Sequence, residues 1–214
     1  GQAAKIFPSK GTDFLFGQGY AAFQLPSSLL VSASFGGAAL YLVEEIEGGY
    51  FDKLRSTPVP RISIILGRLY AELVKGVFLT SLIIAIAMVM GVRVKSGVAG
   101  FLVLTVLVSV WAMVFSGFMQ LVALKTRNAA ATQGAGMVFF PLMFLTPNFV
   151  PRSMLTRPME IAATLNPVTY IMEAARSLIL EGFDATALGR GFLVVLVSGA
   201  LMAVLTVRAI NRYD

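Results

Sequence analysis

Charged side chains gather in one short part of this 214-residue chain, where seven of them lie between Glu44 and Arg61. The stretch "EIEGGYFDKLRSTPVPR" joins most of them to two adjacent glycines and two prolines, whereas residues 21–43 carry no charge at all. Within it, two apolar residues, Phe51 and Leu54, are ringed by charges. That mixture has the composition of a small protein–protein contact.

The residue types that are absent exclude several kinds of chemistry. The chain has neither cysteine nor histidine, so disulfides, thiolate metal sites, imidazole general bases and histidine-dependent serine triads are ruled out. The pattern GxxxxGK[ST] of an ATP-binding P-loop does not occur. We therefore expect no catalytic residue, cofactor or metal in this chain, and any energy for work must come from another protein.

The charged stretch predicts a short helix between two breaks. Gly48 and Gly49 suit a bend, and residues 50–56 have Phe51 and Leu54 on one side at a spacing of three. The following "TPVP" ends the helix, because a residue before proline is pushed away from the helical region. A helix this short needs something packed on it. Either a docking partner or the lipid headgroups would satisfy it.

Composition and charge-free runs predict an all-α membrane protein. The chain is 57% hydrophobic with a mean hydropathy of +0.81, and a spanning helix needs about 20 apolar residues. Five runs qualify, at residues 21–43, 76–92, 96–124, 128–151 and 191–207. Pro141 predicts a kink in the fourth. If the loop at residues 44–68 is cytoplasmic, as the distribution of Lys and Arg favours, the N-terminus is external and the C-terminus cytoplasmic.

Polar residues inside the runs offer a candidate substrate pathway. The third run contains Ser109, Trp111, Phe115 and Gln120, which suit an amphipathic cavity. Serine and similar side chains also bond between helices without any transport role, so ordinary packing stays open as the alternative. Glu72 and Lys75 lie beside the start of the second run, where they are expected to pair at its cytoplasmic end.

A long segment between the last two runs, at residues 148–187, is too apolar for an ordinary loop. Asn166 and Pro167 form an N-cap and first helical position. One face of the helix that follows is apolar, through Ile171, Ala174, Ala175 and Leu178, and its polar residues include Tyr170, Glu173 and Arg176. At roughly 14 residues it reaches only about 21 Å. We therefore expect a re-entrant or interfacial helix on the external side.

Several of these stretches together resemble the ABC-2 type permeases, most of all the branch of daunorubicin-resistance drug exporters. The similarity is carried by "GGYFDKLRSTPVPR" with "ISIILGRLYAELVK", and by "LKTRNAAATQGAGMVFFPLMFLTPNFVPRSML" with "LNPVTYIMEAARSLI". It covers the chain from about Ala21 as one domain. The family usually has six spans, so a first span preceding Gly1 is expected.

The resemblance implies a role for the charged stretch. Residues 47–55 would be the coupling helix, which sits in a groove of a separate nucleotide-binding subunit; its members are Glu47, Tyr50, Phe51, Asp52, Lys53, Leu54 and Arg55. That subunit would bind the ATP and Mg, and a second permease chain would complete the transporter in the plasma membrane. The segment at 148–187 would cap the external mouth of the path.

The cargo and two rival functions stay open. The resemblance favours export of hydrophobic or amphipathic drugs or lipids, while related permeases carry polysaccharides. One Trp and six scattered Tyr give few aromatic platforms for a sugar chain, which tilts the prediction toward an amphipathic cargo. A membrane scaffold that transports nothing and a proton-coupled transporter are the rivals. Nucleic-acid binding is not expected.

Overall fold

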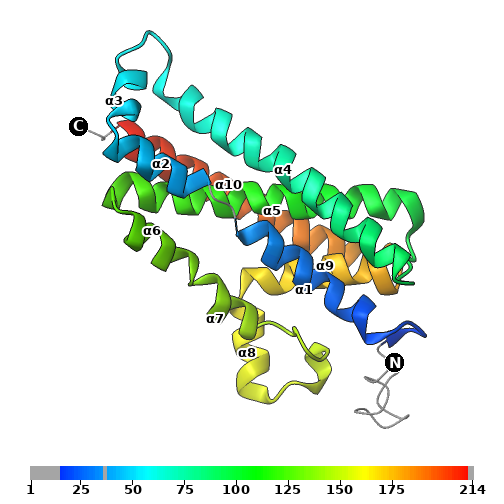
Figure 1. The fold of residues 1–214 in the computed structure, drawn as a ribbon. Coiled ribbons are helices and arrows are strands. Elements are labelled where there is room, and N and C mark those ends of the chain that lie inside the picture. The colour runs from blue at the N-terminus through cyan, green and yellow to red at the C-terminus, as the bar shows by residue number, and fades with distance from the viewer. Residues whose placement is uncertain (1–14, 36–37, 212–214) are drawn as a thin grey trace.

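The computed structural model describes residues 15–35 and 38–211 (Figure 1). Within these ranges the elements, in chain order, are α1 (Tyr20–Ser34), α2 (Ala38–Glu47), α3 (Tyr50–Arg55), α4 (Arg61–Val89), α5 (Gly97–Thr126), α6 (Ala129–Gly136), α7 (Phe139–Phe144), the 3-10 turn η4 (Arg152–Met154), α8 (Arg157–Leu165), α9 (Pro167–Leu180) and α10 (Ala185–Asn211). The described residues contain no strand. The predicted all-α bundle is confirmed.

Four stretches are long and apolar enough to cross a membrane. They are Tyr20–Glu47, which includes α1 and α2, then Ile62–Val89, Gly97–Thr126 and Ala185–Ile210. The shortest has 26 residues, more than the roughly 20 that a bilayer core requires. Four of the five expected spans therefore correspond to stretches of sufficient length, three of them single long helices and one composed of α1 and α2. Two of them begin earlier than the sequence suggested, because a single Arg, Glu or Lys does not interrupt a helix.

The expected span at residues 128–151 is not one helix, and here the structure corrects the sequence-based prediction. Its apolar part, Ala129–Phe144, divides into α6 and α7. Pro141 lies in the first turn of α7 and has no amide hydrogen to donate to the carbonyl of Met137, which its ring also crowds. The chain accordingly turns at Met137 and Val138, one turn before the proline.

Helix α5 is the centre of the bundle. Over an apolar stretch of 18 residues in each helix, 56% of the residues are buried in α5, against 28% in α4 and 17% in α10. It packs against α1, α2, α4, α6, α9 and α10. Gly76 allows α4 to come close, since a Cβ added there would lie 3.1 Å from the Cα of Ser109. The outer faces of α4 and α10 remain apolar and exposed, as suits contact with lipid.

The bundle has two distinct ends (Figure 1). At one, here called the α3 end, the start of α4 meets the end of α10, where Ile62 and Ile210 line the same groove. At the opposite end, the amide of Lys95 donates to the carbonyl of Ile179 (3.0 Å) and Gln18 donates to the same carbonyl (3.1 Å). Helix α1 therefore starts at the opposite end and α10 finishes at the α3 end. Which of the two faces the cytoplasm stays a prediction.

Candidate functional site

Helix α3 forms where the sequence predicted it, at Tyr50–Arg55. Gly49 precedes it with φ +71°, a left-handed conformation that suits glycine. The helix ends through hydroxyl groups: Ser56 Oγ donates to the carbonyl of Lys53 (2.8 Å) and Thr57 Oγ1 to that of Leu54 (2.6 Å). Residues 56–60 are exposed. The result is a short, capped helix that protrudes at the α3 end (Figure 1).

The side chains of α3 divide into an inward and an outward set. Phe51 is completely buried in the core of the chain itself, and Leu54 is half-buried. Tyr50 is 54% exposed, and Asp52 and Lys53 are also exposed. Phe51 was expected to be an anchor for a partner, and the structure revises this: its ring fastens α3 to the bundle. The surface left for a partner is polar apart from Tyr50.

An ion pair closes the base of this loop. Arg68 of α4 donates to a carboxylate oxygen of Glu45 in α2, and both side chains are partly buried. The chain between these two residues contains all of α3, so their pairing fixes the distance between the two ends of the loop. Glu47, which was also expected to take part in coupling, is exposed at the end of α2, and Arg55 ends α3. Sequence alone missed the Glu45–Arg68 pair, because nothing local links residues so far apart.

The four candidate pathway residues of α5 fall into two pairs. Ser109 and Gln120 are fully buried within the bundle, where Ser109 packs on Gly76 and Gln120 donates to Ser116 Oγ (3.1 Å). Such contacts match the packing alternative.

Trp111 and Phe115 have a different position. Both line an apolar cavity of about 180 Å³ between α5, α7, α9 and α10, and Pro167 and Ser198 line it from the last two of these helices. The indole nitrogen of Trp111 donates to Ser34 Oγ (3.1 Å), which holds the ring in place. The structure therefore brings two predicted pathway residues together with one residue of the predicted external segment.

An ion pair inside α4 lies deeper than expected. Lys75 Nζ is 2.7 Å from one carboxylate oxygen of Glu72 and 2.6 Å from the other, and Glu72 is only 5% exposed. Because α4 begins at Arg61, the pair is about 16 Å into the helix at 1.5 Å per residue. It lies within the 28-residue stretch Ile62–Val89, which is long and apolar enough to span a membrane. Charges there are costly unless paired.

Helix α9 starts where the Asn-Pro pair predicted. The side chain of Asn166 accepts from the amide of Val168 (3.0 Å), and Pro167 is the first helical residue. The amide group of Asn166 also donates to the carbonyl of Leu142, which ties α9 to α7 (2.5 Å). The predicted apolar face is fully buried, at Ile171, Ala174, Ala175 and Leu178. Helices α1 and α10 also pack on α9. Helix α9 therefore lies within the bundle and not on its surface.

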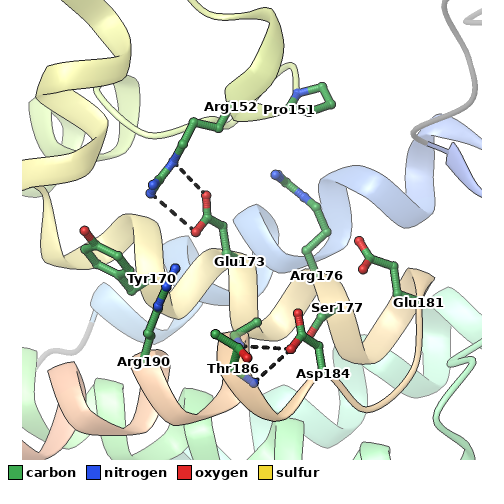
Figure 2. Close-up of a pocket in the computed structure, with 11 residues that line it drawn as sticks. Pro151, Arg152, Tyr170, Glu173, Arg176, Ser177, Glu181, Asp184, Thr186 and Arg190 are labelled. Carbon is green, nitrogen blue, oxygen red and sulfur yellow. Dashed lines mark hydrogen bonds and ion pairs between the residues drawn. The ribbon is translucent and has the colours of Figure 1, made fainter.

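A second cavity, of about 270 Å³, lies at the opposite end of the bundle from α3. Tyr170, Glu173 and Arg176 of α9 line it, so the structure joins these three predicted residues (Figure 2). Arg152 and Arg190, which sequence reasoning did not single out, complete the set from η4 and α10. Only the i, i+3 spacing of Glu173 and Arg176 was visible in the sequence.

The electrostatics of this cavity are unusual. Glu173 binds Arg152, with Nε 3.1 Å from one carboxylate oxygen. Burial raises the pKa of Glu173, and the guanidinium groups of Arg152, Arg176 and Arg190 partly oppose this. Burial also lowers the pKa of Arg176 to about 10, so that its side chain keeps its charge at neutral pH. Among the described residues no cluster of three or more Asp, Glu, His or Cys is arranged to hold a metal.

Comparison with known proteins gives one match. Residues 3–180 match the family model of the ABC-2 type transporters, a region that ends with α9. No curated protein and no solved structure gave a match.

Proposed function

Because the chain belongs to the ABC-2 type transporter family, we propose that it is the membrane-spanning permease subunit of an ATP-driven exporter, with α3 as its coupling helix. The observation that carries the proposal is the construction of α3. It is a protruding helix whose apolar side is fixed to the bundle by Phe51, while Tyr50, Asp52 and Lys53 face outward. A rigid, charged projection suits a lever that another protein pushes.

The permease would work with a separate nucleotide-binding subunit, which binds ATP and Mg, and with a second permease chain. In the plasma membrane the α3 end would face the cytoplasm, where ATP is available, and the cavity lined by Arg176 would lie on the external side. Closure of the ATPase pair would then push α3 and switch the spans between two states. Such a shift requires that the partner bind the two states with different affinities.

The cargo that we propose is a hydrophobic or amphipathic drug or lipid. In support, the cavity between α5 and α9 is lined by Trp111, Phe115 and other apolar side chains, with Ser198 as a polar exception. Its volume of about 180 Å³ is below the range of about 300–1,000 Å³ typical of ligand sites. It would have to widen when the helices move. A polysaccharide would need polar groups that this cavity does not offer.

Co-purification tests the coupling role. The complete chain is expressed with its candidate ATPase subunit and purified in mild detergent, as native protein and as Lys53→Glu or Tyr50→Ala. Both residues are exposed on α3, so the fold should tolerate the changes and the ATPase should be lost. Lys125→Glu is the matched control, because Lys125 is an exposed lysine at the end of α5, outside α3. Retention of the ATPase by both α3 variants would favour the scaffold alternative.

The cargo class is tested separately, through stimulation of ATP hydrolysis by the purified complex in liposomes. Amphipathic compounds should stimulate it and soluble polysaccharides should not. Ser198→Leu places a larger side chain in the cavity and should reduce the stimulation, whereas Val197→Leu, on the exposed face of the same helix, should not. Equal stimulation in both variants would remove this cavity from the proposed path.

A further inference from the structure

The cavity at the end opposite α3 is lined by three arginines and three acidic residues, and among the described residues only one of these acids, Glu173, forms an ion pair. Arg152, Arg176 and Arg190 reach it from η4, α9 and α10 (Figure 2). One carboxylate, that of Glu173, interacts with all three guanidinium groups. Its two oxygens are both within 3.4 Å of Arg152. Because Glu173 is committed to Arg152, no carboxylate of the described residues forms an ion pair with Arg176 or Arg190.

Arg176 is the least satisfied of the three. It is only 8% exposed, yet its contacts are the ring of Phe23, 3.7 Å from the guanidinium carbon, and the sulfur of Met172 at 3.4 Å. Its Nε makes no hydrogen bond. A buried charge without a hydrogen-bonded counterion is costly. An anion in the cavity would therefore stabilise this arrangement.

The acidic side chains around the cavity do not supply a hydrogen-bonded counterion for Arg176. Within the described part of the chain, neither Arg176 nor Arg190 forms an ion pair. One carboxylate oxygen of Asp184, Oδ1, caps the start of α10, where it accepts from the amides of Thr186 (2.8 Å) and Ala187 (3.3 Å). The charge of Glu181 acts on Arg176 and raises its pKa, but Glu181 is exposed and forms no ion pair with it. The two arginines are thus available to an incoming anion, for which the guanidinium group is well shaped.

An apolar stripe runs down α10 from this cavity. Leu193, Val197, Leu201 and Val204 follow Arg190 at helical spacings of three or four, and they are 62%, 60%, 53% and 48% exposed. Residues so spaced share one face of a helix. A cation at the top of an exposed apolar stripe matches a molecule with an anionic head and a hydrocarbon tail. The cavity, at about 270 Å³, suits a headgroup and not a whole lipid.

We infer that this cavity binds the phosphodiester group of a phospholipid from the membrane leaflet at the end opposite α3, with Arg176 and Arg190 on the phosphate and the acyl chains along α10. The site goes beyond the proposed transport function. It requires only that the chain spans a membrane. Its occupancy would brace α9 against α10.

Native mass spectrometry of the delipidated full chain in detergent tests the site. The probes are short-chain phosphatidylglycerol, the diacylglycerol with the same chains but no phosphate, and inorganic phosphate. Phosphatidylglycerol should bind and diacylglycerol should not. Arg190→Gln should weaken phosphatidylglycerol binding about tenfold, the scale set by hydrogen bonds to a charged group. Because Arg190 is exposed, this variant should keep its fold. Arg176→Gln should weaken binding at least as much, with its melting temperature measured alongside.

Arg157→Gln is the matched control. Arg157 is an exposed arginine at the start of α8 and does not line the cavity, so its variant should bind as the native chain does. Equal binding of diacylglycerol, or unchanged affinity in Arg190→Gln, would overturn the proposal. Displacement of the lipid by inorganic phosphate at similar concentrations would make this a site for a free anion and overturn the lipid assignment. These results concern binding alone, so they do not depend on whether an ATPase co-purifies.

Discussion

Replacement of Phe51 by alanine is expected to release α3 from the bundle while the spans stay folded. The ring of Phe51 is fully buried, and truncating a buried phenylalanine to alanine costs about 3–5 kcal/mol. Helix α3 has 6 residues and cannot remain helical without packing. At 1.4 kcal/mol per factor of ten, the population with α3 detached should rise roughly one hundred to three thousand times.

Hydrogen exchange of the purified chain measures this opening. The amides to follow are those of Lys53, Ser56 and Thr57, which donate to the carbonyls of Gly49, Asp52 and Leu54 at 3.1 to 3.3 Å. Their exchange should accelerate strongly in Phe51→Ala, because exchange follows the population of the open form. Amides in the centre of α5 should exchange as before.

Tyr50→Ala is the control, because Tyr50 lies next to Phe51 but is 54% exposed. Surface substitutions usually change stability by less than about 0.5 kcal/mol, so exchange should change by about twofold at most. If the two variants accelerate exchange equally, or if Phe51→Ala accelerates it less than tenfold, Phe51 does not anchor α3 and the lever interpretation loses its basis.

Three further predictions concern α9 and the helices packed on it. Asn166→Ala should lower stability by about 1–2 kcal/mol through the lost cap, which thermal unfolding measures. The melting temperature of Glu173→Gln, relative to that of the native chain, should increase as the pH rises above 4.5. Burial raises the pKa of Glu173 in the folded chain, so ionisation of Glu173 destabilises the native chain and cannot affect the glutamine variant. A constant difference in melting temperature across this pH range would contradict the prediction. Gly191→Ala should destabilise by about 1–3 kcal/mol, since the new Cβ would lie 2.6 Å from that of Ala174, and adding Ala174→Gly should restore part of the loss.

Local signals in the sequence predicted local structure well. The Asn166–Pro167 pair indicated the start of α9, and the paired glycines with the "TPVP" stretch bracketed α3 to within one residue. Continuous apolar runs identified the four candidate spans. These features depend on neighbouring residues only, through capping, backbone restriction and hydropathy. No tertiary information is needed to find them.

Features set by tertiary packing were not predictable from one sequence. The spacing of Phe51 and Leu54 revealed an apolar side of α3, but the same pattern fits a ring packed on a partner and a ring packed on the bundle. The buried position of Arg176 was missed for a related reason. A polar residue on a predicted helix is expected to face water. In the folded chain, however, Phe23 of α1 covers Arg176. The position of α1 cannot be read from the sequence of α9. Periodicity identifies a face of a helix but not the element that covers it.

The two candidate sites lie at opposite ends of the bundle, and α4 joins them. Its start is held to the base of α3 by the Glu45–Arg68 pair. Its far end continues into the turn where Ser96 bonds the carbonyl of Leu178 in α9, with Oγ at 2.6 Å. A helix is stiff along its axis, so in the proposed cycle a displacement of α3 would reach α9 through α4. Glu72 and Lys75 pair within that helix, which lowers the cost of carrying two charges in a span. A phospholipid between α9 and α10 would resist the same displacement, so its binding and the movement of α3 should oppose one another.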